Sequence, residues 1–217
     1  NDTGHDVKFF GATASRHVTW DESADSLILS GNLDVNDGTI KLDGNYPTGS
    51  DNVALGNTAL DSVEAGGSGN TAIGNNALTA VTTADSNTAV GQNTLRANLQ
   101  TGNTAIGAGA MCTNDNGYDN TAVGKNSLNK NTGGYQNTTV GNNSLCSNLA
   151  ADDGTAIGYN ALKSNTTANA NTAVGSSALT SNTTGVSNVA VGKSSLCSNT
   201  TGTSNVAIGF EASRLNT

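Results

Sequence analysis

A short phrase in which two apolar residues follow a polar pair recurs along most of the chain. The phrase is clearest in Asn103-Thr104-Ala105-Ile106-Gly107 and returns, for example, as Asn171-Thr172-Ala173-Val174-Gly175. In an extended segment Thr and Ile fall on one side and Ala on the other. Strands fit the phrase better than helices, because an interior Gly costs a helix about 1 kcal/mol relative to Ala.

The glycine that closes each phrase recurs at a nearly constant spacing. Successive separations are 18, 17 and 16 residues and then six times 17. Such a period is typical of repeat architectures, in which each unit buries its apolar side against the next. We therefore expect an all-β fold, a parallel β-solenoid or β-roll of about ten 17-residue coils with two short strands each, spanning roughly 48 Å. The glycines expected at its corners are Gly56, Gly74, Gly91, Gly107, Gly124, Gly141, Gly158, Gly175, Gly192 and Gly209.

Two further positions recur with each glycine. Four residues after it stands Leu, or Met111, in nine of the ten units, and this side chain is expected on the second strand, inside the coil. If Ile and Val also fill the interior, the alanine two residues before the glycine points outward, and its uniformly small size suggests close packing of another chain. The opposite assignment, with Ala inward and Ile/Val between chains, leaves an apolar stripe that also demands association. The candidate trimer-packing alanines are Ala54, Ala72, Ala89, Ala105, Ala122, Ala156, Ala173, Ala190 and Ala207.

Residues 1–51 form a different module, and the repeats occupy residues 52–217. Apolar runs around Val7–Phe10, His17–Trp20 and Leu27–Leu29, separated by turn-forming residues, predict a small antiparallel β module. Thr39-Ile40-Lys41-Leu42 is expected to be a last strand, and the segment around Pro47 a linker. About 50 residues with so few core side chains are only marginally stable alone, so the module is expected to complete its core against copies of itself.

The chain carries 9 basic and 17 acidic residues, a formal charge of -8. An acidic chain repels phosphate backbones, so nucleic acid is not an expected partner. Residues 52–217 hold eight of the acids and six of the bases, so the repeats are polar with little charge. No apolar run approaches the roughly 20 residues of a membrane-spanning helix, so membrane insertion is not expected either.

Few residues offer chemistry, and we expect no catalytic, cofactor or metal site. His5 and His17 lie near Asp6, Asp21 and Glu22, but no activated nucleophile accompanies them. The Asn114–Asp119 segment is rich in side-chain oxygens, yet it lacks the spacing and final Glu of an EF-hand. An ordinary Asn-Gly corner is the simpler interpretation of that segment.

The three cysteines all stand five residues after their glycine, so they share one column of the solenoid. At ~4.8 Å per coil, Cys112, Cys146 and Cys197 are roughly 10 and 14 Å apart, beyond the ~7 Å between Cα atoms that a disulfide allows. Other units place Asp61, Arg96 or Lys163 in this column, so we expect free, exposed thiols. Tyr118, Tyr135, Tyr159 and Phe210 are the aromatic residues of the array; they are expected to cover corners of the rod, with glycan stacking as the alternative.

The Asn-Thr-Ala-Ile/Val-Gly phrase resembles the head repeats of trimeric autotransporter adhesins and, still more, the repeats of bacteriophage tail fibres. Asp6–Thr13, Trp20–Ser23 and Leu27–Leu29 are similar to segments that precede such arrays in fibre proteins of marine phages. The resemblance implies a left-handed β-roll and three chains side by side. The 17-residue unit is longer than the usual adhesin-head period.

These observations predict a non-enzymatic segment of a homotrimeric phage tail fibre, a stiff spacer in the virion that carries host-receptor binding. Its expected partners are two further copies, other virion tail proteins and a host receptor bound through a region beyond this chain. The chain begins at Asn1 and stops in mid-repeat at Thr217, so both ends are expected to be cuts through a longer protein. The alternative is the head of a bacterial trimeric adhesin at the cell surface, which binds host glycan or matrix. Exposed thiols favour the phage assignment, because adhesins pass through an oxidising periplasm.

Overall fold

The computed structural model describes residues 7–10, 17–21, 26–29, 49–64 and 66–215. The chain divides into two compact units, residues 1–42 and 43–217. In the first unit, strand β1 (Val7–Phe10) pairs antiparallel with β2 (His17–Asp21), which pairs antiparallel with β3 (Ser26–Leu29). The run at 39–42 and most of the expected linker lie outside the described residues.

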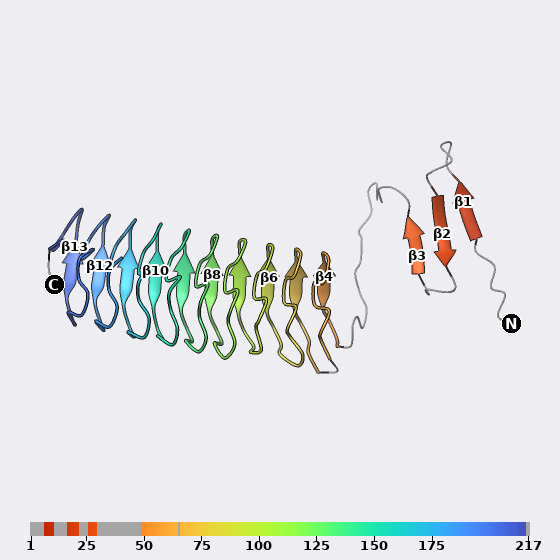
Figure 1. Cartoon of the computed structure of the whole chain (residues 1–217), viewed down its shortest axis with the longest axis horizontal. Helices are drawn as coiled ribbons and strands as arrows, with labels where there is room; N and C mark the ends of the chain where they lie inside the picture. The colour runs from red at the N-terminus through yellow and green to blue at the C-terminus, as the bar shows by residue number, and fades with distance from the viewer. Residues whose placement is uncertain (1–6, 11–16, 22–25, 30–48, 65, 216–217) are drawn as a thin grey trace. The chain divides into compact units, whose positions relative to one another are not determined.

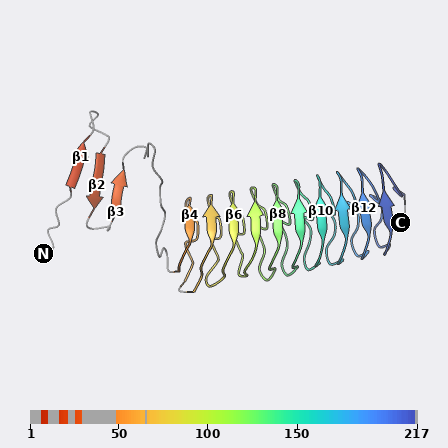
Figure 2. The same cartoon turned by 180° about the vertical axis from the view of Figure 1, so that it is seen from behind.

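The second unit is a parallel β-solenoid whose coils stack along one axis (Figures 1 and 2). Each coil of its described residues contributes one three-residue strand to a ten-stranded parallel sheet, in sequence order and in register. For example, Ala105 lies opposite Ala122, 17 residues further on. The strands are β4 (Val53–Leu55), β5 (Thr71–Ile73), β6 (Thr88–Val90), β7 (Thr104–Ile106), β8 (Thr121–Val123), β9 (Thr138–Val140), β10 (Thr155–Ile157), β11 (Thr172–Val174), β12 (Val189–Val191) and β13 (Val206–Ile208). The predicted solenoid with a 17-residue coil is confirmed, and the described residues contain no helix.

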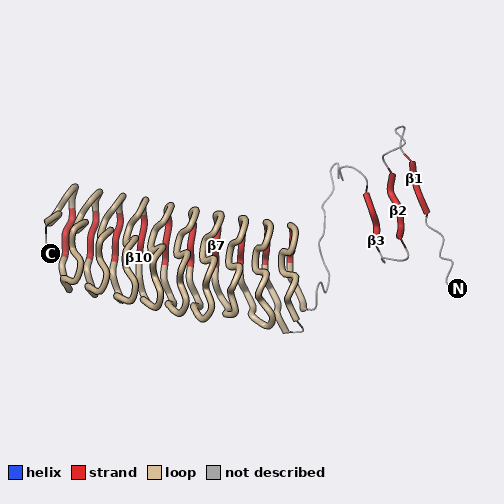
Figure 3. Tube along the Cα trace, viewed as in Figure 1, coloured by secondary structure: helices blue, strands red, loops and turns tan. Residues whose placement is uncertain are grey.

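The expected second strand of each coil is absent from the described residues, where turns occupy its place (Figure 3). The recurring leucine lies in such a turn with a left-handed backbone, for instance with a φ of 51° at Leu128. Its amide still donates to the next coil, since Leu128 N bonds Ser144 O at 2.9 Å. The coils are therefore joined by parallel hydrogen bonds even where the backbone is too curved to form a strand.

The interior of the solenoid is narrow and filled by small side chains around one leucine per coil. The side chains of Leu128 and Ala122 are fully buried. The alanines of the strands thus point inward, and the Ile and Val side chains beside them point outward. This is the second of the two assignments that the sequence left open. Eight of the nine candidate trimer-packing alanines are buried inside the coil, and Ala54 packs against the same core, so their side chains are not placed to contact another chain.

Glycine is required at the corner that follows each strand. Gly124 has a φ of 131°, and a Cβ built there would lie 2.5 Å from the carbonyl oxygen of Gly141 in the next coil. By contrast, a Cβ at Gly133, in a loop, would meet nothing within 4 Å. The period of glycines in the sequence therefore marks the closest approach of successive backbones.

Two ladders of buried asparagines run through the interior, a role that the recurrence of Asn in each unit does not by itself reveal. In the strand-side ladder, formed by the Asn before every strand except β10, Asn120 Nδ2 donates to Asn103 Oδ1 at 3.2 Å and to Gly134 O at 2.9 Å. Its Oδ1 accepts from the backbone N and Nδ2 of Asn137, both at 3.0 Å. The turn-side ladder consists of Asn98, Asn114, Asn131, Asn148, Asn165, Asn182 and Asn199, whose successive side-chain amides are hydrogen-bonded except between Asn148 and Asn165.

Candidate functional site: the outer face of the sheet

The outer face of the ten-stranded sheet is the most uniform surface of the solenoid. It is formed by the first and third residues of β4–β13, which we call the sheet face. The first positions hold seven Thr and three Val, and the third positions hold Ile, Val and, in β4, Leu. None of these twenty side chains is charged, and nineteen of them are β-branched.

The sheet face is partly exposed in a single chain, although much of it is apolar. Ile106 keeps 40% of its surface exposed, and Ile208 at the last described strand keeps 71%. The pattern follows from the strand period, because buried Ala at the centre of each strand turns its two neighbours outward. Parallel pairing then stacks identical residue types in rows about 4.8 Å apart along the solenoid.

Other exposed columns of the solenoid accept charge freely. The column five residues after each glycine holds Asp61, Arg96 and Lys163, all exposed. The exclusion of charge is therefore a property of the sheet face and not of the repeat as a whole.

Two tyrosines of successive coils form a second surface feature. The rings of Tyr118 and Tyr135 stack with centroids 4.9 Å apart and planes 6° apart. The Asp152 carboxylate accepts from Tyr135 N at 3.1 Å, and its negative charge raises the pKa of Tyr135 above its ordinary value. Tyr159 and Phe210 are each exposed and directly follow a corner glycine.

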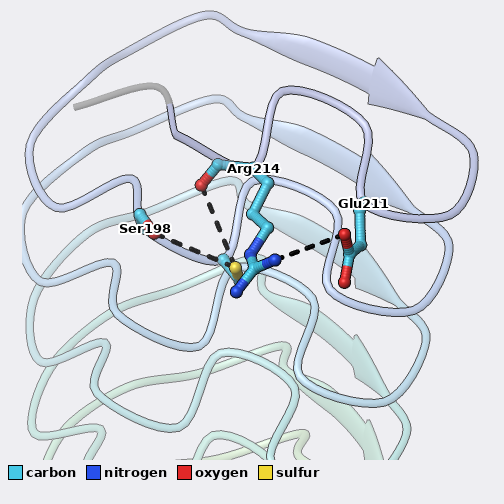
Figure 4. A network of polar contacts seen from close by, with 4 residues as sticks. Ser198, Glu211 and Arg214 are labelled. Atoms are coloured by element: carbon cyan, nitrogen blue, oxygen red, sulfur yellow. Dashed lines mark hydrogen bonds and ion pairs between the residues drawn. The ribbon is translucent and has the colours of Figure 1, made fainter.

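The three thiols are free, as predicted, but half-buried rather than exposed. Two of them lie near the backbone of the next coil: Cys146 Sγ is 3.9 Å from Lys163 O, and Cys197 Sγ is 3.9 Å from Arg214 O. Cys197 Sγ also lies 3.9 Å from the Ser198 hydroxyl oxygen. Arg214 forms a 3.3 Å ion pair with Glu211 (Figure 4).

The oxygen-rich Asn114–Asp119 segment is a corner whose first side chain points into the coil. Asn114 Nδ2 donates to Asn98 Oδ1 at 2.7 Å and to Gly117 O at 2.6 Å, so its amide belongs to the turn-side ladder. Within the described part of the chain, no group of three His, Cys, Asp or Glu side chains could hold a metal ion. His5 lies outside the described residues, and His17 begins β2.

No helix long and apolar enough to cross a membrane occurs among the residues that the structure describes. Neither the protein-family models, nor the curated proteins, nor the solved structures compared with this chain match it.

Proposed function

We propose that this chain is a non-enzymatic structural segment of a trimeric fibre of the phage tail-fibre type, a spacer that carries a host-receptor-binding tip away from the particle. The observation that carries this proposal is the sheet face, with twenty outward side chains and no charge among them.

A face that stayed in water would have no reason to exclude Lys, Asp and Glu from every position. Ten rows at ~4.8 Å make an uncharged strip roughly 43 Å long. Contiguous apolar strips of this kind mark interaction sites. A regular strip is best matched by another strip with the same row spacing, which a second copy of the chain provides.

Three copies packed around a common axis would bury these strips and stiffen the rod. The number three rests on the resemblance of the repeat phrase to trimeric fibres. Closed cyclic symmetry also lets each copy present the same surfaces to its neighbours.

The test introduces one charge into the sheet face and compares it with the same charge elsewhere. Ile106→Lys should convert the trimer to single chains at micromolar concentration, because the ammonium would lose its hydration in the interface. Leu149→Lys is the matched control, since Leu149 is an apolar side chain that is 42% exposed but lies off the sheet face. Sedimentation equilibrium gives the masses. If the wild-type protein has the mass of a single chain and keeps its fold, the proposal is refuted.

A second candidate, the head of a bacterial trimeric adhesin that binds host glycan, is favoured by the Tyr118–Tyr135 stack beside Asp152. Aromatic rings and a carboxylate are groups that can contact sugar rings and hydroxyls. Binding of the wild-type chain to a glycan array, abolished by Tyr118→Ala, would support this candidate. An array without any bound glycan would count against it.

A further inference from the structure

The two edges of the sheet face carry opposite charge. The residues two positions before each strand form one edge, which we call the acidic edge. The residues that directly follow each corner glycine form the other, which we call the basic edge. The acidic edge holds Asp51, Asp119 and Asp153 among its ten positions and no base. The basic edge holds Lys125 and Lys193, with several Asn and Gln and no acid. All five of these charged side chains are exposed.

The charges of one coil do not meet within a single chain. Asp119 and Lys125 lie at opposite ends of β8, six residues apart, a separation of at most roughly 20 Å at about 3.3 Å per residue. In the described part of the chain the one ion pair joins Arg214 to Glu211, so Asp119 and Lys125 are both without an ionic partner.

We infer, on the basis of the proposed self-association, that copies of this chain pack parallel, with Asp119 of one copy paired to Lys125 of the next at the same height. When parallel copies surround an axis, the acidic edge of each meets the basic edge of its neighbour. Antiparallel copies packed through the same face would bring acidic edge to acidic edge. A closed ring also allows no axial shift between copies.

At the other levels no two like charges meet, because Asp51, Asp153 and Lys193 face Asn57, Tyr159 and Ser187 at the same height. At β7 both edge residues are small, Gly102 and Ala108, and at β9 both are amides, Gln136 and Asn142. Because the rows of the sheet face repeat at every coil, that face alone would fit its neighbour nearly as well after a one-coil shift. The pair of Asp119 and Lys125 distinguishes these registers, since a one-coil shift would place Lys125 beside Gly102 or Gln136.

A zero-length carbodiimide cross-link tests the pairing directly. Chains labelled with ¹⁵N are mixed with unlabelled chains, allowed to exchange, treated with the carbodiimide and digested. We expect an amide between the Asp119 carboxyl and the Lys125 amine, in peptides that combine labelled and unlabelled halves. A cross-linked oligomer that joins Lys125 only to Asp153, or to no acidic-edge residue, would overturn the inference.

A charge swap gives a second readout in solution. Lys125→Asp should raise the concentration at which half of the chains are dissociated by up to about fivefold for each pair lost, since an exposed pair contributes up to ~1 kcal/mol. The double variant Asp119→Lys/Lys125→Asp should restore wild-type association. Lys163→Asp, the same charge change at an exposed site off both edges, should leave association unchanged. If the wild-type chain is monomeric, the proposed self-association fails; if it associates but the swap does not rescue it, only this pairing fails.

Discussion

The leucine of each coil holds a backbone conformation that leucine normally avoids. From Leu60 to Leu196 these residues, with Met111, have φ values between 44° and 52°. A left-handed residue of this kind costs about 1–2 kcal/mol. Full burial of a leucine side chain contributes roughly 1.5–3 kcal/mol, and its amide bonds the next coil. The strain is therefore offset locally, which explains why a large apolar residue can recur at a turn.

The alanine at the centre of each strand gives a prediction at the same scale. Ala122→Leu should lower the free energy of unfolding by about 1–3 kcal/mol, because the narrow interior cannot accept three extra carbons. Chemical denaturation measures this loss. Ala150→Leu, at an exposed position off the sheet face, should be close to neutral. If Ala122→Leu instead dissociated the oligomer without destabilising the chain, the alanines would belong to the interface after all.

The asparagine ladders are the element that makes a polar interior possible. Asn120 has both of its amide protons and its carbonyl oxygen bonded, although its side chain is fully buried. A buried amide costs little when all its groups are paired, and a good deal when one is not. Because each amide bonds the coil before and the coil after, the ladder favours in-register stacking. It also replaces part of the apolar burial that such a thin core cannot supply.

Replacing one ladder amide by a carboxyl should make stability depend on pH. In Asn120→Asp, burial among carbonyl oxygens raises the carboxyl pKa in the folded state above its unfolded value of about 3.9. Between these two values the folded state binds more protons, so stability falls as pH rises. Urea unfolding midpoints at pH 4 and pH 7 measure the difference. Asn116→Asp, at an exposed position, should show no such fall in stability. If the urea midpoint changes equally with pH in the two variants, the proposed burial of the charge is contradicted.

The sequence contained enough to predict the coil but not which residues fill it. The glycine period gave the parallel register, because Gly124 must let the backbone of Gly141 approach. Strand alternation showed that Ala122 and Val123 face opposite ways, yet only the coil's width decides which is inside. Asn and Gly both tolerate turns, so the recurrence of residues such as Asn131 is equally compatible with a solvent-facing corner. The burial of Asn131 depends on a partner 17 residues away, Asn114, which no local pattern reveals.

The whole solenoid depends on contacts between successive coils, since each coil touches only its neighbours. The strand-side ladder has one gap, where Gly154 stands in place of Asn. Asn137 Oδ1 accepts there from Gly154 N at 2.8 Å, but no side-chain amide continues the ladder to Asn171. Among the described residues, Asn171 therefore has no side-chain acceptor in the preceding coil, whereas the backbone N and Nδ2 of Asn137 and of Asn188 both bond the Asn one coil earlier.

We therefore expect the coil around Gly154 to open more readily than its neighbours. Hydrogen exchange at the amides of β10 (Thr155–Ile157) should be faster than at the chemically similar β8 (Thr121–Val123), by about tenfold for each 1.4 kcal/mol lost. Mass spectrometry of peptic peptides under native conditions resolves the two segments. Uniform protection across both strands would show that the backbone bonds alone set the stability of the joints.

The direction of the bonds between coils has a mechanical consequence. A pull on the two ends of the solenoid acts along those hydrogen bonds, so coils separate one after another instead of resisting together. Each 17-residue coil that opens releases about 55 Å of chain in exchange for ~4.8 Å of rod. A single chain is thus an extensible tether under load. Side-by-side copies would change this behaviour, because a coil could then peel away only by leaving its neighbours as well, and the same sequence would act as a strut.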